Sequence, residues 1–211
     1  MKSQLSFPPV EEANEDGLLA YGGDLSPEFL ELAYRSGIFP WYNEDNPILW
    51  WSPDPRFVLF PDKLKISKSM KQLLKKNDFR FSINEAFSEV IHNCRIQYRP
   101  GQGGTWISDD MEAAYNRLHT SGLAHSAECW KGNQLVGGLY GIRLEKVFCG
   151  ESMFSIESNA SKFAFISYVQ QIKTEGIELI DCQVYTEHLE SFGAEMIPRS
   201  EFLKYINQSK A

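Results

Sequence analysis

The hydrophobic pattern of the chain becomes regular near Phe60, after an irregular beginning. Apolar residues spaced three and four apart predict helices over residues 67–76, 84–94, 108–122 and 159–175, with shorter ones at 186–192 and from Ser200. Alternating or short continuous apolar runs predict strands at residues 79–83, 124–131, 134–144, 146–154, 177–184 and 195–198. From residue 79 the predicted order is therefore strand, two helices, three strands, helix, strand, helix and strand, before the last helix.

The first 58 residues have a different composition, rich in Pro, Gly and Trp. They contain one clear helix, with Ser26 as the N-cap, Pro27 in the first turn and Gly37 as the stop. We expect a small irregular N-terminal domain over residues 1–58 and a second domain over residues 59–211.

Polar side chains follow two predicted strands that a helix separates. Glu151 lies in GESMFS, and Asp181 and Gln183 lie in DCQV. If these strands are parallel neighbours, the three side chains converge at one carboxyl end of the sheet, where open α/β sheets bind ligands. The alternative is a solvated strand end.

Two carboxylates and an amide at such an edge can hold an amine beside an activated carbonyl. An amine that attacks an ester needs orientation, electrostatic support and loss of a proton, but no enzyme nucleophile. The sequence contains no Ser-His-Asp order, zinc-ligand spacing or Walker loop. These residue types therefore favour direct acyl transfer, and we expect it to require no metal or cofactor.

The order of elements resembles the acyltransferase fold of the GNAT superfamily. This resemblance implies an α/β (α+β) domain with a mixed sheet flanked by helices, in which two parallel strands separate to form the active cleft. The donor of that superfamily is acyl-coenzyme A, held by a glycine-rich turn. Here the corresponding turn has Gly150 but no later glycine, so another activated acyl donor fits better.

The charge of the chain limits how nucleic acid can bind. A formal net charge of −7 excludes a uniformly basic surface, so any contact with phosphates must come from a local patch. Such a patch is predicted on the helix over residues 67–76, from Lys68, Lys71, Lys75 and Lys76. The alternative is an ordinary solvated helix face.

Several aromatic and apolar residues have two possible roles. Trp41 and Trp106 lie beside flexible turns, where their rings can stack on an unpaired base or pack at a domain junction. The apolar residues predicted to flank the cleft are core candidates that can also form a side-chain pocket: Leu139, Phe148, Phe165, Tyr168 and Ile180.

The chain has no secretory signal pattern and no apolar run of membrane-spanning length, so we expect a cytoplasmic protein. Its four cysteines lack metal-ligand spacing and are expected to be reduced. Cys182 with His188 raises the alternative of a cysteine hydrolase, but the acidic neighbour Asp181 would raise the thiol pKa and so weaken the nucleophile.

Segments in order along nearly the whole chain resemble the leucyl/phenylalanyl-tRNA–protein transferase family. They are GLLAYGGDLSPEFLELAY, GIFPWY, PILWWSPDPR, ISKSMK, GTWI, AYNRLH, AHSAE, LVGGLYG, FCGESMFS, NASK and LIDCQV. The resemblance implies a bacterial enzyme that moves Leu, Phe or Met from aminoacyl-tRNA to an N-terminal Arg or Lys of an acceptor protein. The new N-terminus would mark that protein for N-end-rule degradation.

The resemblance also implies roles for the candidate residues. Trp41 and Trp106 would hold the terminal adenosine, the four lysines would contact the acceptor stem, and the five apolar residues would line the side-chain pocket. Glu151 would bind the α-amino group of the donor amino acid, while Asp181 and Gln183 act on the attacking amine. Because a Gln amide does not titrate near neutrality, we expect Gln183 to orient the amine.

Two other functions stay open at this stage. One is a coenzyme A–dependent N-acetyltransferase, and the other is a non-catalytic binder of tRNA ends. Nothing in the sequence demands a second subunit, and we expect a monomer.

Overall fold

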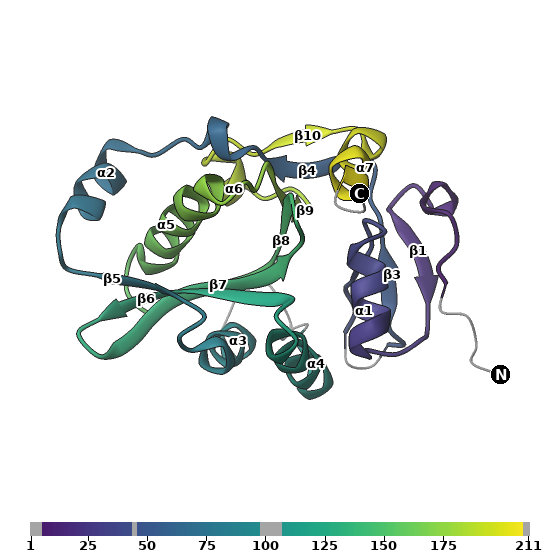
Figure 1. The fold of residues 1–211 in the computed structure, drawn as a ribbon, viewed down its shortest axis with the longest axis horizontal. Helices are drawn as coiled ribbons and strands as arrows, with labels where there is room; N and C mark the ends of the chain where they lie inside the picture. The colour runs from purple at the N-terminus through teal and green to yellow at the C-terminus, as the bar shows by residue number, and fades with distance from the viewer. Residues whose placement is uncertain (1–5, 44–45, 98–106, 209–211) are drawn as a thin grey trace.

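The computed structural model describes residues 6–43, 46–97 and 107–208 (Figure 1). Its larger part is a seven-stranded sheet in the order β10-β4-β9-β8-β7-β6-β5. The strands are β4 (Arg56–Leu59), β5 (Arg80–Ile83), β6 (Ala124–Lys131), β7 (Gln134–Arg143), β8 (Val147–Ser155), β9 (Leu179–Gln183) and β10 (Glu195–Ile197). Among the described strands, only β8 and β9 pair in parallel, so the sheet is mixed.

Helices cover both faces of this sheet (Figure 1). On one face lies α5 (Ala160–Thr174), which packs on β6, β7 and β8 and contacts α2 (Lys68–Lys75). On the other face lie α3 (Phe87–Ile96) and α4 (Asp109–Thr120). The short helix α6 (Glu187–Glu190) and the helix α7 (Arg199–Gln208) flank β10 in sequence. The α/β prediction of a mixed sheet flanked by helices is confirmed.

Glycines of β7 allow the helices to approach the sheet closely. A Cβ atom on Gly137 would lie 2.6 Å from the Cβ of Ala160 at the start of α5. A Cβ on Gly138 would lie 2.8 Å from the carbonyl oxygen of Ala127 and 3.2 Å from Val90 of α3. The GGLYG segment thus marks a close approach of the backbone to its neighbours.

The first part of the chain forms a three-stranded sheet in the order β1-β3-β2 beside α1. Its elements are β1 (Leu18–Tyr21), α1 (Pro27–Tyr34), β2 (Phe39–Pro40) and β3 (Leu49–Trp51), with short 3-10 helices at Val10–Glu12 and Pro61–Lys63. The predicted helix is confirmed, and Gly37 follows it with φ +75°. Buried residues of this part and of α3, α4 and α7 belong to one hydrophobic cluster.

The strand that links the two parts, β4, was not predicted from the sequence. Arg56–Leu59 pairs with both β9 and β10, within the seven-stranded sheet. The predicted boundary between residues 58 and 59 lies inside this strand. The strand β4 belongs to the larger sheet. The division of the chain into two domains stays a prediction.

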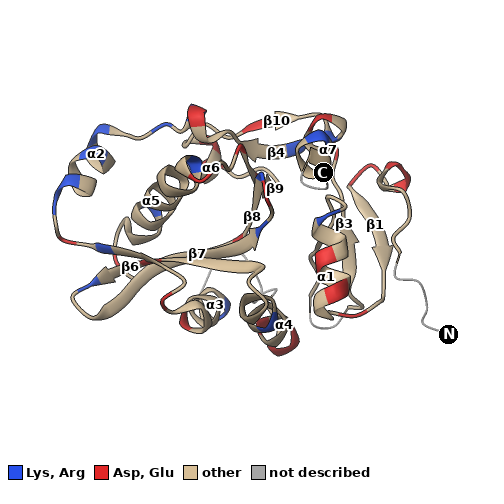
Figure 2. Cartoon of the chain, in the orientation of Figure 1, with Lys and Arg blue, Asp and Glu red and all other residues tan. Residues whose placement is uncertain are grey.

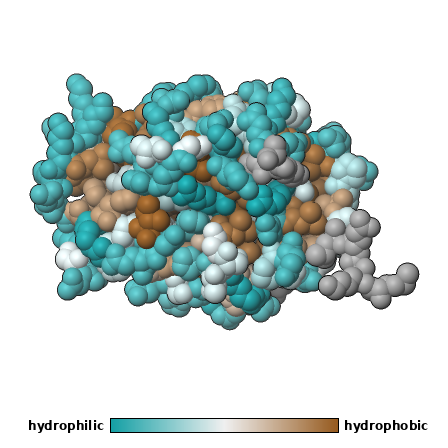
Figure 3. Space-filling view, viewed as in Figure 1, coloured by the Kyte–Doolittle hydropathy of each residue, from teal (hydrophilic) through white to brown (hydrophobic). Residues whose placement is uncertain are grey.

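The surface mixes apolar and hydrophilic side chains without one continuous apolar face in the view of Figure 3. Across the described ranges, no helix is both long and apolar enough to cross a bilayer.

Candidate active site

The parallel pairing of β8 with β9 stops within the predicted site. The last paired residues are Cys149 and Asp181, after which the two strands no longer form a ladder. The β7–β8 register also shifts here, because Tyr140 pairs with Ser152 while Gly141 pairs with Gly150. Glu151 is therefore the extra residue of a β-bulge, an irregularity that re-aims a side chain and is common beside active sites.

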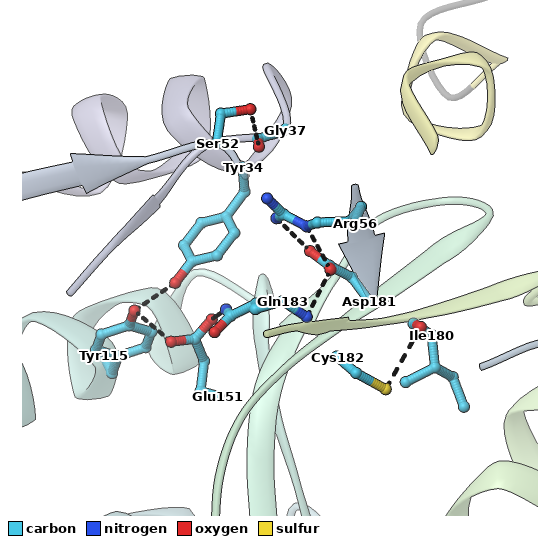
Figure 4. A network of polar contacts seen from close by, with 10 residues as sticks. All are labelled: Tyr34, Gly37, Ser52, Arg56, Tyr115, Glu151, Ile180, Asp181, Cys182 and Gln183. Atoms are coloured by element: carbon cyan, nitrogen blue, oxygen red, sulfur yellow. Dashed lines mark hydrogen bonds and ion pairs between the residues drawn. The ribbon is translucent and has the colours of Figure 1, made fainter. Parts of the chain in front are cut away.

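Glu151 and Gln183 meet across this opening (Figure 4). The Gln183 Nε2 donates to Glu151 Oε1 at 2.7 Å, and the Tyr115 hydroxyl donates to Glu151 Oε2 at 3.0 Å. Tyr115 in turn shares a short hydrogen bond with the Tyr34 hydroxyl. The chain of contacts joins α1, α4, β8 and β9 around one carboxylate.

Burial changes the acidity of Glu151. Desolvation raises its pKa from 4.5 to about 7, and the negative charge of Asp181 acts in the same direction. Hydrogen bonds from Tyr34, Tyr115 and Gln183 favour the ionised form and oppose this rise. The carboxyl group is thus poised to gain or lose a proton near neutral pH.

Asp181 lies behind this pair in a buried ion pair. Arg56 donates Nε to Asp181 Oδ1 and Nη2 to Oδ2, both at 2.7 Å, and each side chain is 1% exposed. Asp181 Oδ1 also accepts the backbone N–H of Gln183 at 2.9 Å. Asp181 therefore contacts the backbone of Gln183, whereas Glu151 contacts the side chain of Gln183.

An apolar cavity of about 300 Å³ opens beside these polar groups. Glu151, Asp181 and Gln183 line it together with four of the predicted pocket residues, Leu139, Phe148, Phe165 and Ile180. Tyr168 is not among the lining residues of this cavity, so its place in the side-chain pocket stays a prediction. Its ring packs behind Phe148, with the centroids 4.8 Å apart and only 1% of the residue exposed.

Trp41 lies at the same cavity, beside Phe39 and Pro40 of β2. Its side chain is 43% exposed, although its ring lies 5.8 Å from that of Trp51. An exposed aromatic face at the edge of a cavity is suited to stacking. Trp106 lies outside the described residues.

The comparison with known proteins identifies the family. The family model described as leucyl/phenylalanyl-tRNA protein transferase matches residues 58–207, and the model of that family's N-terminal domain matches residues 23–54. The chain belongs to this family. The leucyl/phenylalanyl-tRNA–protein transferase of Christiangramia forsetii is 58% identical over 205 residues, which cover 96% of this chain and 97% of the relative. That of Flavobacterium johnsoniae is 59% identical over 202 residues, covering 96% and 95%.

Solved structures with a related arrangement are more distant. A GCN5-related N-acetyltransferase from Kribbella flavida is 11% identical with a TM-score of 0.38, and covers 82% of this chain and 61% of its own. Assignment to the transferase family rests on the sequence relatives.

The four predicted lysines lie on one helix or directly after it. Lys68, Lys71 and Lys75 belong to α2, and Lys76 follows as its C-cap. Figure 2 shows the basic positions along this helix in blue. The side chains of all four lysines are exposed. Ser67 caps the helix by accepting the backbone N–H of Met70 at 3.2 Å. Met70 is buried while the lysines point away from the core, so this helix presents a basic face.

The cysteine-hydrolase alternative is not supported in this transferase. All four thiols, those of Cys94, Cys129, Cys149 and Cys182, are buried and lie outside any disulfide. For Cys182, burial and the charge of Asp181 raise the thiol pKa far above its ordinary value. A reactive thiolate is therefore disfavoured where the hydrolase would need it.

Three residues of the polar network were missed from sequence: Tyr34, Tyr115 and Arg56. Both tyrosines occupy apolar faces of helices, so their spacing is typical of core residues. Arg56 stands at the start of the missed strand β4. A charged residue opening the apolar run FVLF was the one available signal that its side chain needed a buried partner.

Proposed function

We propose that the chain is an aminoacyltransferase that moves Leu, Phe or Met from aminoacyl-tRNA to the N-terminal Arg or Lys of an acceptor protein. Membership of the transferase family supports the reaction. The observation that carries the proposal is the contact between Glu151 and Gln183 at the edge of an apolar cavity. It places groups suited to binding amines beside a space suited to an apolar side chain.

The donor amino acid would occupy the cavity. Leu139, Phe148, Phe165 and Ile180 form apolar walls for its side chain. Trp41 would stack on the terminal adenosine of the tRNA, with Trp106 as the second stacking residue proposed from the family resemblance. Glu151, in its ionised form, would bind the α-amino group of the esterified amino acid.

Transfer requires no covalent enzyme intermediate. The amine nitrogen of the acceptor attacks the ester carbonyl carbon of the donor. A C–N bond forms, the bond from the carbonyl carbon to the ribose oxygen breaks, and the proton lost by the amine ends on that oxygen. With an α-amine pKa of about 8, roughly a tenth of the acceptor is already neutral at pH 7.

Gln183 would orient the attacking amine. Its Nε2 donates to Glu151, which leaves its Oε1 to accept an N–H of the amine. Asp181 cannot reach that amine freely, because both of its carboxylate oxygens already accept hydrogen bonds from Arg56. Orientation by Gln183 therefore accounts for the site better than proton relay through Asp181 does.

The basic face of α2 would bind the acceptor stem of the tRNA. Four exposed lysines within nine residues offer contacts to phosphates in a chain of net charge −7. We further propose that the protein acts in the cytoplasm as a monomer, and that the product N-terminus marks the acceptor for degradation.

A direct assay tests the proposal. The protein is incubated with leucyl-tRNA and a peptide that begins with Arg, and the peptide is then weighed by mass spectrometry. We expect the mass of one leucine residue to be added at its N-terminus. The same peptide with an acetylated N-terminus is the matched control and should remain unmodified.

Two further arms separate the alternatives. Leucine with ATP but without tRNA should give no product, because the ester is the activated donor. Acetyl-coenzyme A in place of leucyl-tRNA should also give none. Transfer of acetyl instead of leucyl would replace the proposal by an N-acetyltransferase, and tight tRNA binding without any transfer would indicate a non-catalytic binder.

A further inference from the structure

Arg56 is a buried arginine of β4 whose side chain contacts Asp181 (Figure 4) and two aromatic rings. Its guanidinium carbon lies 4.7 Å from the ring centroid of Phe39 and 4.6 Å from that of Phe202. These rings come from β2 and α7, which lie far apart in sequence. Between them, the planar fork makes its two 2.7 Å hydrogen bonds to Asp181.

Stability alone does not explain this pair. Burial removes water from both charges, and a buried ion pair is often no more stabilising than apolar side chains of the same size. The Nη1 of Arg56 is also buried without a hydrogen-bond partner within the described part of the chain, which adds a further penalty. Asp181, held by this pair, also contacts a neighbour within the site.

Asp181 passes the constraint on to Gln183. The same Oδ1 that accepts Arg56 Nε accepts the backbone N–H of Gln183. Gln183 has φ 64°, a left-handed conformation that is uncommon for any residue but glycine. Because the ladder between β8 and β9 has already ended at Asp181, this hydrogen bond supplies a restraint that β8 does not.

We propose that Arg56 is a positioning residue for the transfer reaction, fixing Asp181 so that it holds Gln183 in its left-handed conformation with the side-chain amide on Glu151. Asp181 stays paired with Arg56 throughout the reaction and acts through the Gln183 backbone, not as a proton acceptor. The inference rests on the proposed function, since it assigns roles within the same site.

Arg56→Lys tests this role because it keeps the charge but loses the fork. We expect kcat for leucine transfer to an Arg-initiated peptide to fall by about 10-fold or more, with KM for leucyl-tRNA changed by less than about twofold. Ile172→Val, a conservative change in the buried face of α5, is the matched control for altered packing and should leave both constants nearly unchanged. An unchanged kcat in Arg56→Lys overturns the proposal, as does a loss that lies wholly in KM.

A second measurement does not depend on activity. The side-chain amide of Gln183 gives ¹⁵N–¹H resonances that Gln183→Ala removes and so assigns. These resonances should shift in Arg56→Lys and stay in place in Ile172→Val. Unshifted resonances overturn the positioning role even if activity falls. Should the wild-type protein transfer no leucine, the proposed function fails, and this comparison still decides whether Arg56 positions Gln183.

Chemical rescue covers the case in which Arg56→Lys does not fold at the assay temperature. Arg56→Ala leaves a space between two aromatic rings that a guanidinium ion can fill. Added guanidinium should restore kcat in this variant and leave the kcat of Ile172→Val unchanged. Absence of recovery, with the variant folded, counts against the proposal.

Discussion

Glu151 and Gln183 are each held by neighbours that come from other elements. Glu151 sits at a bulge of β8 and accepts hydrogen bonds from Tyr115 and Gln183. Gln183 adopts its left-handed conformation beside Asp181. Because the two residues are held by different neighbours, substitutions at Glu151 and at Gln183 should have distinguishable effects on stability and on transfer.

Gln183→Ala should slow transfer without weakening donor binding. It removes the amide that orients the attacking amine and leaves the cavity walls intact. We expect a fall of about 10- to 100-fold in the single-turnover rate, the range set by one hydrogen bond to a charged or reacting group. The dissociation constant for leucyl-tRNA, measured by filter binding, should stay the same. A rate equal to that of the wild type would remove Gln183 from the mechanism.

Glu151→Gln should alter how stability depends on pH. The pKa of Glu151 is about 7 in the folded protein, compared with 4.5 for an ordinary glutamate. Between these pH values the folded state therefore keeps a proton that the unfolded state has lost. The wild type therefore loses stability as pH rises between these values, and the loss levels off above pH 7. Because Glu151 is partly exposed, we expect less than the full effect of this pKa shift. The unfolding free energy of the variant, relative to that of the wild type, should increase by about 1 kcal/mol from pH 5.5 to pH 8.

Urea unfolding at the two pH values measures this gain. The exposed Glu15→Gln is the matched control and should show no such change. If the stability difference between Glu151→Gln and the wild type were the same at pH 5.5 and pH 8, Glu151 would not retain its proton in the folded protein.

At the scale of elements, the bulge between β7 and β8 places Glu151, and Gly141 permits it. A Cβ on Gly141 would lie 2.2 Å from the carbonyl oxygen of Cys149. Gly141→Ala should therefore cost about 1–3 kcal/mol of unfolding free energy, because backbone must shift to admit the methyl group. Gly150→Ala is the control, since its Cβ would meet nothing closer than 3.6 Å. Thermal unfolding of both variants checks the difference.

The basic face of α2 makes a separate prediction for tRNA. Replacing Lys71 and Lys75 by Ala should raise KM for leucyl-tRNA and leave kcat at saturation unchanged. The slope of log KM against log salt should become shallower by about 0.7–0.9 for each lysine–phosphate interaction that the substitutions remove. Lys204→Ala, an exposed lysine on α7, is the control. An unchanged salt slope in the double variant would place the tRNA elsewhere.

The periodicity of the sequence was enough to predict most of these helices and strands. It was not enough to predict the polar contacts that join them at the site. The strands from β5 to β9 and the helices α1 to α5 follow from spacing and caps. β4 was missed because RFVL is a short run after the turn-rich SPDPR. Arg56 and Asp181 are 125 residues apart, so no local pattern can reveal their pairing. Tyr34 and Tyr115 were hidden because a buried tyrosine on an apolar helix face resembles any core residue.

At the scale of the whole molecule, the first part of the chain completes the site. Tyr34 of α1 contacts Tyr115, and Phe39, Pro40 and Trp41 line the cavity. Arg35, which follows α1, also pairs with Glu145 in the turn between β7 and β8. The site therefore depends on how α1 and β2 are held against the larger sheet.

Tyr34→Phe tests this dependence. The Tyr34 hydroxyl lowers the pKa of Glu151, so its removal should raise that pKa further. If ionised Glu151 binds the donor α-amino group, the acid limb of kcat/KM for leucyl-tRNA should move to higher pH. Tyr21→Phe, at a tyrosine that is 79% exposed, is the control. Superimposable pH profiles for all three proteins would show that α1 does not influence Glu151.

The burial of all four native thiols has a practical consequence for following the reaction. Maleimide dyes react with accessible thiolates, so the wild-type chain should stay unlabelled while folded. A single cysteine substituted for Ile156, which is 58% exposed just beyond β8, would then carry a fluorophore at one defined place. Binding of the aminoacyl-tRNA could be followed by the fluorescence of that dye without first replacing the four native cysteines.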